Sequence, residues 1–231
     1  TTLTSDIQIL PKALENINNT NAVIEQPEKI REILAHEPRV VAFAERILAG
    51  GIISSATNSM ATFVVGIDPD EETRLGSRRT IVQGEWMTSD DREGAAIGDK
   101  MREVLGVEIG DKIVVTAQDY YGGLAGSAYR LVATFSTGND QIDNGTVLLL
   151  RPTAQELLSF GGRVSKFGLR VEPREEVPRV VEDLKKKIGD GDLKVVTWEE
   201  LIPMMAQLMR FQNGMLFIIA LIVLTVVAAG I

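Results

Sequence analysis

The chain has 231 residues, of which 24% are charged and 45% hydrophobic, proportions typical of one or two globular domains. Its formal net charge of -8 argues against nucleic acid as a partner, because binding a phosphate backbone needs a basic face. With no cysteine and a single histidine, His36, the sequence excludes a cysteine nucleophile, a thiolate zinc site and a paired-histidine metal site. We therefore expect no catalytic residue, metal ligand or bound cofactor in this segment.

The first elements predicted along the chain are a strand, a helix and a second strand. Ser5 to Leu10 has the character of an extended segment. Pro27 then opens a helical pattern, and the apolar run Val40 to Phe43 follows it as a strand. The apolar residues that share one face of this helix are Ile30, Ile33 and Leu34.

The middle of the chain, from about Ser54 to Leu150, consists mainly of short strand-like runs separated by turn signals such as Asn144-Gly145. One short helix is predicted from Asp99 to Leu105, and Gly106 closes it. The predicted strands are Ala61–Ile67, Thr80–Gln83, Lys112–Ala117, Tyr129–Phe135 and Thr146–Leu150. This region is therefore predicted to be a mostly β insertion.

The strand, helix and strand of the N-terminal region recur near the end of the chain. Lys166 to Glu172 is predicted as a strand, Pro173 to Ile188 as a helix that stops at Gly189, and Lys194 to Trp198 as the next strand. Two β-α-β units thus flank the insertion. We predict a single module assembled from both ends of the chain.

A stalk is predicted between this module and the last part of the chain. Thr197 to Glu200 has the spacing of a capping box, and Pro203 indicates a kink or a new helix start. Two interpretations of the apolar residues beyond it stay open, a packed seam between helices and a methionine-rich surface for lipid or acyl chains. The candidate residues for membrane-proximal coupling or lipid contact are Met205, Leu208, Met209, Phe211 and Met215.

The last stretch, Met215 to Ile231, contains no charged residue. Its length lies at the lower limit of a membrane-spanning helix, roughly 17–25 residues. We predict that it is the start of a transmembrane helix, and that the chain is a segment of a larger membrane protein. The folded domain before it then lies outside the bilayer.

Several short sequences occur together here in the order found in one known family. They are Val65 to Pro69, Gly94 to Gly98, Leu105 to Val107 with Gly110-Asp111, and Phe135 to Gly138 with Asp143, followed by the ending from Trp198. In this order they resemble the periplasmic core domain of FtsX/MacB-type ABC transporter permeases. LolC/LolE-type lipoprotein-releasing permeases share the layout. The resemblance covers nearly the whole chain.

The resemblance implies an α+β fold with a porter-like module, made of the β-α-β repeat, and an inserted, mostly β sabre-like subdomain. A stalk and the start of a transmembrane helix complete the chain. The expected parts are 1–53 and 147–200 for the porter-like module, 54–146 for the sabre-like insertion, 201–214 for the stalk and 215–231 for the transmembrane helix.

The resemblance also implies a non-catalytic role that depends on partners. A cytoplasmic ABC ATPase would supply ATP and Mg, since this chain has no G-x-x-x-x-G-K-[ST] sequence. A second permease copy, identical or different, would complete the transporter, and a periplasmic protein or lipoprotein would be its partner or cargo. Residues 1–210 would face outward from a bacterial cytoplasmic membrane. The domain would pass ATP-driven motion to lipoprotein release or to efflux of hydrophobic substrates.

In lipoprotein-releasing members, a hairpin between two sabre strands hooks a periplasmic carrier protein. The corresponding stretch here, Gln118 to Ser127, is short and rich in glycine and lacks the proline and methionine of that hook. We therefore do not expect carrier binding of that type. Tyr120, Tyr121 and Leu124 are the candidate partner-binding residues, because tyrosine anchors interfaces at low entropic cost. The alternative is a hairpin tip whose rings fold against the sheet.

Three other interpretations concern acidic residues and the class of protein. Asp68 to Glu72 lacks the alternating ligands and glycine of a calcium loop, so we expect a solvated turn. Asp140 and Asp143 form a carboxylate pair that would suit a membrane-tethered hydrolase, although turn chemistry accounts for them better. A single-pass, membrane-anchored binding or scaffold protein without an ATPase is the other alternative.

Overall fold

The computed structural model describes residues 5–14, 22–77, 79–189, 191–197 and 200. Residues 1–195 form one compact unit and 196–231 a second. The predicted stalk and transmembrane helix, 201–231, lie outside the described residues. Within the described part of the chain, no helix has the length and apolar character needed to cross a membrane. Of the predicted capping box, the amide of Glu200 donates to Oγ1 of Thr197 at 3.4 Å.

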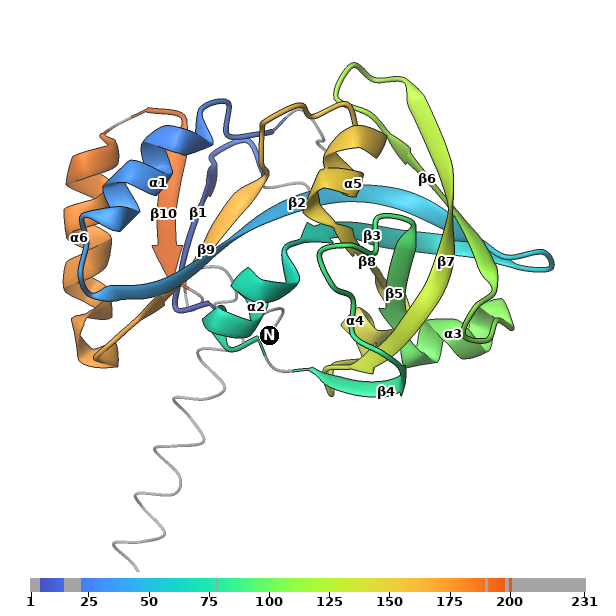
Figure 1. The fold of residues 1–231 in the computed structure, drawn as a ribbon. Coiled ribbons are helices and arrows are strands. Elements are labelled where there is room, and N and C mark those ends of the chain that lie inside the picture. Colours follow the sequence, from blue (N-terminus) through green and yellow to red (C-terminus); the bar gives the residue numbers. More distant parts are fainter. Residues whose placement is uncertain (1–4, 15–21, 78, 190, 198–199, 201–231) are drawn as a thin grey trace, which may run out of the picture. The chain divides into compact units, whose positions relative to one another are not determined.

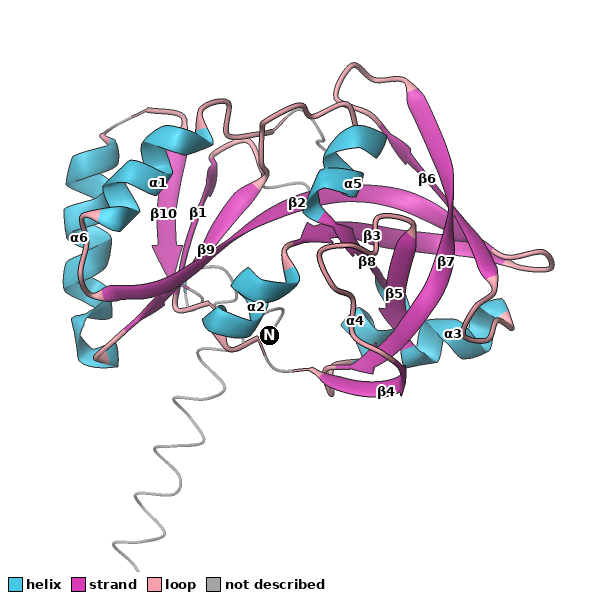
Figure 2. Cartoon of the chain, viewed as in Figure 1, coloured by secondary structure: helices cyan, strands magenta, loops and turns pink. Residues whose placement is uncertain are grey.

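The two ends of the chain build one four-stranded part of the sheet, as the repeat predicted (Figures 1 and 2). Its strands lie in the order β10-β1-β9-β2, and β9 is antiparallel to both of its neighbours. This order, with a helix after β1 and another after β9, is that of a ferredoxin-like split β-α-β fold. The elements are β1 (Ile7–Pro11), α1 (Pro27–Ala35), β2 (Val40–Ser54), β9 (Lys166–Val171), α6 (Val177–Ile188) and β10 (Leu193–Thr197).

Helices α1 and α6 pack on the same face of these strands. Each helix begins with a proline in its first turn and carries one buried apolar stripe, as helical spacing requires. The stripes meet Ile7 and Ile9 of β1 and Phe167 and Leu169 of β9 in one hydrophobic core. The buried helix residues are Ile30 and Leu34 in α1 and Val180, Val181 and Leu184 in α6.

The insertion forms a closed ring of six strands, in the order β2-β3-β8-β5-β7-β6 and back to β2. Inward residues such as Ile97, Val115 and Leu149 are fully buried, because closure places alternate side chains inside the barrel. The remaining strand, β4 (Thr80–Gly84), pairs with β7 outside the ring. The ring strands added by the insertion are β3 (Ser59–Ile67), β5 (Gly94–Gly98), β6 (Lys112–Gln118), β7 (Leu124–Ser136) and β8 (Thr146–Leu150).

Four short helices connect these strands, and only α3 (Asp99–Leu105) was predicted from the sequence. The expectation of a solvated turn at Asp68 to Glu72 was wrong. Instead, α2 (Pro69–Leu75) begins there, with the Asp68 carboxylate accepting from the amides of Asp70 and Glu71 at 3.0 and 3.1 Å. Helices α4 (Asp140–Gly145) and α5 (Arg151–Leu157) and the strand β5 were not predicted as such. Their runs are too short to show a period.

Strand β2 belongs to both sheets. Its first half, from Val40 to Arg46, pairs with β9, and its second half, from Ile47 to Ser54, pairs with β3. From Gly51 onward it also pairs with β6 and thereby closes the barrel. The predicted boundary between residues 53 and 54 falls at the end of this strand. One uninterrupted strand therefore connects the four-stranded part of the sheet to the six-stranded ring.

Candidate functional site

The hairpin between β6 and β7 has a tight, internally bonded tip. The strands pair up to Gln118 opposite Leu124, which leaves five residues for the turn. The Asp119 carboxylate accepts from the amides of Tyr121 and Gly123 at 3.0 and 2.7 Å. Gly122 has a positive φ of 86°, a conformation that L side chains rarely adopt. The tip is thus ordered by its own sequence rather than open.

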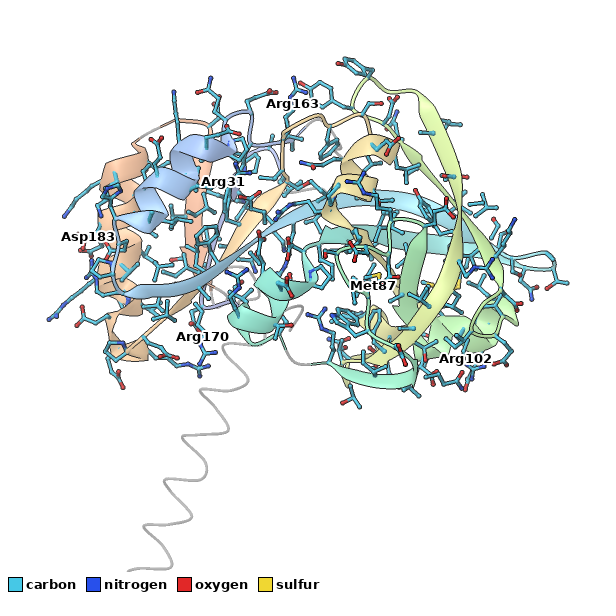
Figure 3. All side chains as sticks on the ribbon, viewed as in Figure 1. Arg31, Met87, Arg102, Arg163, Arg170 and Asp183 are labelled. Carbon is cyan, nitrogen blue, oxygen red and sulfur yellow. The ribbon has the colours of Figure 1, made fainter. Side chains whose placement is uncertain are left out.

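Tyr120 anchors this tip to the body of the domain. Its amide donates to the carbonyl of Leu158 at 2.8 Å, and its ring meets Phe160 edge-on at 6.3 Å between centroids. Its hydroxyl donates to Glu25 at 3.0 Å, while the guanidinium of Arg163 lies 4.5 Å from the ring centroid. Arg163 is labelled in Figure 3, close to this hairpin. The ring therefore contacts both Phe160 and Arg163.

The pKa values in this cluster shift as its contacts require. The hydrogen bond from Arg163, at 2.5 Å, lowers the pKa of Glu25, with smaller contributions from Tyr120 and from the charge of Arg163. The same carboxylate raises the pKa of the Tyr120 hydroxyl, since it stabilises the protonated phenol. Both groups therefore keep their charge states at neutral pH, and the anchor is stable there.

The predicted set of partner-binding residues is divided by this arrangement. Tyr120 folds against the domain, whereas Tyr121 and Leu124 are 77% and 85% exposed. Tyr121 lies edge-on to Tyr120 at 5.3 Å between ring centroids. The folded-ring alternative therefore describes Tyr120, whereas partner binding by Tyr121 and Leu124 stays a prediction. The second predicted group of residues, Met205, Leu208, Met209, Phe211 and Met215, lies outside the described residues.

A buried ion pair lies where β2 passes from one sheet to the other. Arg46 and Glu72 are both fully buried, with contacts of 2.5 Å from Nε and 3.0 Å from Nη2 to the carboxylate. Ser77 also donates to this carboxylate, and Arg79 lies 3.6 Å from it. Burial alone would raise the pKa of Glu72, but these donors and cations together lower it. The pair therefore stays ionised and fixes α2 to β2.

The opposite face of β2 carries a second network, because neighbouring strand residues point to opposite faces. The carboxylate of Glu45 accepts from Arg31 of α1 at 2.8 Å and lies 3.7 Å from Arg151, the first residue of α5. Arg151 also pairs with Glu71 at 2.6 Å, and Glu71 accepts from the amide of Glu45 at 2.9 Å. Figure 3 labels Arg31 beside α1. Three helices are thus tied to one point of β2.

Sequence reasoning missed this junction. The available signal was the pair Glu45-Arg46 inside an otherwise apolar run of β2, from Val40 to Ile53. Charged residues are rarely fully buried unless they are paired, so two adjacent charges in a core strand indicate buried partners. Local spacing does not identify those partners. Glu72 is 26 residues from Arg46 in the chain, and Arg31 is 14 residues from Glu45.

Asp140 and Asp143, the carboxylate pair of the hydrolase alternative, both have structural partners. Asp143 is buried and accepts from Ser136 Oγ, Thr137 Oγ1 and the Thr137 amide, each at 2.8 Å. Asp140 is 76% exposed at its side chain and pairs with Lys100 at 2.7 Å. Asp143 therefore stabilises a turn, and Asp140 forms a surface ion pair. Among the residues that the structure describes, no group of three or more His, Cys, Asp or Glu could hold a metal ion.

The sequence and the fold of this chain are similar to those of known proteins. The sequence matches MacB-like periplasmic core domains over residues 2–187. The periplasmic region of MacB from Actinobacillus actinomycetemcomitans has a similar fold, with a TM-score of 0.60 and 12% identity over 89% of this chain and 94% of that one. For the extracellular domain of the noncanonic ABC-type transporter YknZ from Gram-positive bacteria, the TM-score is 0.57 and the identity 16%, over 83% and 99%.

One curated relative is a permease much longer than this chain. An uncharacterized ABC transporter permease from Methanocaldococcus jannaschii is 24% identical over 158 residues, which cover 65% of this chain. The chain spans only 37% of that relative's length. Together these matches define the class of protein as the periplasmic or extracellular domain of a membrane permease, a non-catalytic part of an ABC transporter. The chain belongs to the family of MacB-like periplasmic core domains.

Proposed function

We propose that this domain passes ATP-driven motion from a cytoplasmic ATPase to a partner or cargo outside the membrane. The observation that carries the proposal is β2, one strand of 15 residues that belongs to both sheets. A force applied to the porter-like part reaches the barrel along a hydrogen-bonded backbone, with no loop in between. The domain then acts as a lever rather than as two parts on a linker.

The two ion networks support this mechanical role. A bend of β2 between Glu45 and Arg46 would separate buried charges from their partners, Arg31 on one face and Glu72 on the other. Breaking a fully buried pair such as Arg46 and Glu72 by removing one partner costs about 3–5 kcal/mol, so such bending is strongly disfavoured. The stiff point of the lever lies where the two sheets meet.

The proposed partners follow from the permease context. An ABC ATPase, with ATP and Mg, would drive the motion, and a second permease copy would complete the transporter. The stalk residues Met205, Leu208, Met209, Phe211 and Met215 would couple the membrane helix to the domain or contact lipid. Tyr121 and Leu124, held in place by Tyr120, would contact a protein outside a bacterial cytoplasmic membrane. Lipoprotein release and efflux of hydrophobic molecules are the candidate outputs.

Spin labels on the intact permease, with its ATPase in lipid nanodiscs, test the lever directly. Thr57, at the exposed tip of the β2–β3 hairpin, and Lys186 of α6 would each be replaced by cysteine in a cysteine-free background. Within one domain, the Thr57–Lys186 distance should stay constant when ATP binds. Between two copies, the Thr57–Thr57 distance should change. A constant distance between copies, or a change within one domain, would contradict the lever.

The alternative is a membrane-anchored binding or scaffold protein without an ATPase. Purification of the intact protein in mild detergent separates the two functions. A stoichiometric ATPase subunit, or ATP hydrolysis by the same polypeptide, supports the lever. A protein without nucleotide turnover in several detergents favours the anchored binding protein.

A further inference from the structure

One edge of the barrel wall is incomplete beside the anchored hairpin. Strand β7 pairs with β6 from Leu124 onward, but β5 joins its other side only at Arg130, opposite Gly94. The segment from Leu124 to Tyr129 is therefore bordered by a described strand on one side alone. Residues of this part of β7 and of α5 line a hollow of about 560 Å³.

The register shows which backbone groups face this hollow. Both backbone groups of Leu131 bond on the β6 side, to Gly110 at 2.7 Å and Asp111 at 2.9 Å, whereas the amide of Arg130 donates to Glu93 on the β5 side at 2.8 Å. Because these directions alternate along a strand, Gly126 and Ala128 present their amide and carbonyl groups to the hollow. Those groups match the requirements of one added strand.

The edge lacks the features by which proteins protect exposed strands. Such edges usually carry lysine, proline or a bulge that prevents pairing with another chain. Here the edge reads Ala125-Gly126-Ser127-Ala128, four small residues without a charge. The β6–β7 register is also regular along this stretch. Small side chains leave the backbone open to an approaching peptide.

The groove is preformed, because bonds at both ends hold α5 at its distance from β7. At one end the Tyr120 amide binds the carbonyl of Leu158, immediately after α5. At the other end the hydroxyl of Thr153 donates to the carbonyl of Arg92 at 3.0 Å. A peptide that enters this space pays little for reordering the protein.

The charges around the groove indicate what kind of peptide fits. The groove is lined by three cationic side chains, those of Arg92, Lys112 and Arg130. None of the ion pairs found among the described residues includes them. Lys112 and Arg130 lie directly opposite each other in the β6–β7 register, which places two like charges together. Two carboxylates, Glu93 and Glu156, also line the hollow. In a chain of net charge -8, this local excess of positive charge favours an acidic group at that end.

We propose that the edge of β7 from Leu124 to Tyr129 binds an extended peptide segment of a partner protein. The peptide adds as a strand between β7 and α5 and places an acidic side chain against Lys112 and Arg130. The exposed Leu124 and Tyr121 continue this surface at the hairpin tip. The inference deepens the proposed function, since it states how the extracytoplasmic partner is held.

Fluorescence anisotropy with the intact permease and its ATPase in nanodiscs tests the site. The probe is a fluorescein-labelled peptide of about six alternating Val and Thr residues with a terminal Asp, long enough to span the open edge. A matched peptide carries Asn in place of Asp. We expect the Asp peptide to bind, and absence of binding of both peptides up to about 1 mM would overturn the proposal.

Two substitutions at one position separate strand addition from other binding. Ala128→Pro removes only an amide that faces the groove, and proline is tolerated at that kind of edge position. It should raise Kd of the Asp peptide by about tenfold or more, while Ala128→Val, which keeps the amide, should change it less than about twofold. Equal binding by A128P and the parent would refute strand addition. Unchanged thermal unfolding of A128P confirms that it folds.

A third variant tests the charge. Lys112→Gln should weaken the Asp peptide about threefold and leave the Asn peptide unchanged, as expected for an exposed ion pair. Equal weakening of both peptides would exclude an acidic side chain at this end. Amide protection at Gly126 and Ala128 that rises with protein concentration, without peptide, would assign the edge to a second copy instead.

The proposed function and this inference fail in distinguishable ways. If A128P loses the peptide but keeps the ATP-dependent Thr57–Thr57 distance change, the edge binds a peptide and the lever works without it. If the distance does not respond to ATP while the peptide still binds, the lever is wrong and the edge site stands.

Discussion

At the scale of single residues, some charged groups in the interior of this domain have an opposite charge as partner, and among the described residues Lys166 does not. Arg46 and Glu72 neutralise each other, but Lys166 lies directly opposite Arg46 on the same face of the sheet. Its amine donates to Gln8 at 3.2 Å rather than to a carboxylate. Burial, reinforced by the charge of Arg46 and opposed by Glu72, lowers the pKa of Lys166 to about 7. Its charge therefore depends on pH near neutrality.

Lys166→Met should reduce a pH dependence of stability. Between about pH 7 and 10.5 the unfolded chain keeps this lysine protonated while the folded protein does not, so stability of the parent rises with pH in that window. The gain in unfolding free energy from K166M should be larger at pH 6 than at pH 10, by about 4 kcal/mol. Urea denaturation at both values measures it, with the exposed Lys29→Met as control. A pH-independent difference would contradict the lowered pKa.

Glu37 is a buried charge that stabilises the fold, in contrast to Lys166. The side chain is 4% exposed and pairs with Arg39 at 2.7 Å and Lys187 of α6 at 3.0 Å. These hydrogen bonds, first that from Arg39, lower its pKa to about 2. Its stabilisation is therefore fully present above pH 4.5 and is lost as the pH falls toward 2.

Glu37→Gln should lower the unfolding free energy by about 1–2 kcal/mol at pH 7. The difference from the parent should shrink steadily between pH 4.5 and 2, because the parent carboxylate becomes protonated there. Denaturation at a series of pH values measures this, and the exposed Glu32→Gln serves as control. A difference that is constant down to pH 2 would show that Glu37 does not act through its charge.

At the scale of elements, close backbone approach decides how the barrel meets its covering helix. Strand β3 passes directly beneath α5, and Gly66 is the residue at the contact. A Cβ atom there would lie 2.5 Å from the Cβ of Ala154 and 2.9 Å from that of Ile47. Neither neighbour is a flexible side-chain end. The small residue is therefore required by packing between strand and helix.

Gly66→Ala should lower the unfolding free energy by about 3 kcal/mol, since overpacking forces β3 and α5 apart. Gly162→Ala is the matched control, because nothing lies within 4 Å of a Cβ built at that position. Chemical denaturation of both variants measures the difference. Equal stability of the two would mean that α5 shifts without cost, and the fixed width of the groove beside β7 would be in doubt.

At the scale of the whole molecule, the proposed lever needs an input and an output. The lever needs an input through the stalk, and the sequence places apolar residues at helical spacing between Pro203 and Met215. In the proposed function, the anchored hairpin and the open edge of β7 would form the output side. Mechanical continuity between the two ends is provided by β2.

Leu208→Glu should uncouple the two ends in the intact permease. A charge in the stalk disturbs its packing or lipid contact, so the ATP-dependent Thr57–Thr57 distance change should fall below about a third of that of the parent. ATP hydrolysis should stay near the parent rate, because this chain holds no nucleotide-binding sequence. Pulsed electron spin resonance and a phosphate-release assay measure the two quantities. Equal loss of both would argue against separate input and output.

The sequence by itself determined the elements whose signals are local. Helical spacing and the stop at Gly189 predicted α6, and the repeated order of strand, helix and strand predicted the module made from both ends of the chain. Apolar runs with turn signals predicted most strands of the insertion. The exposed tip was predicted correctly in position, although its strand β7 begins earlier than expected, at Leu124.

Only the tertiary structure decided which distant residues meet. The ring closes because β2 reaches both β3 and β6, and Tyr120 is anchored by Glu25 across 95 residues of chain. The pair of Arg46 with Glu72, the groove beside β7 and the division between Tyr120 and Tyr121 all depend on such contacts. Periodicity reports which face of an element is apolar, whereas partners from other elements are selected by packing of the whole fold.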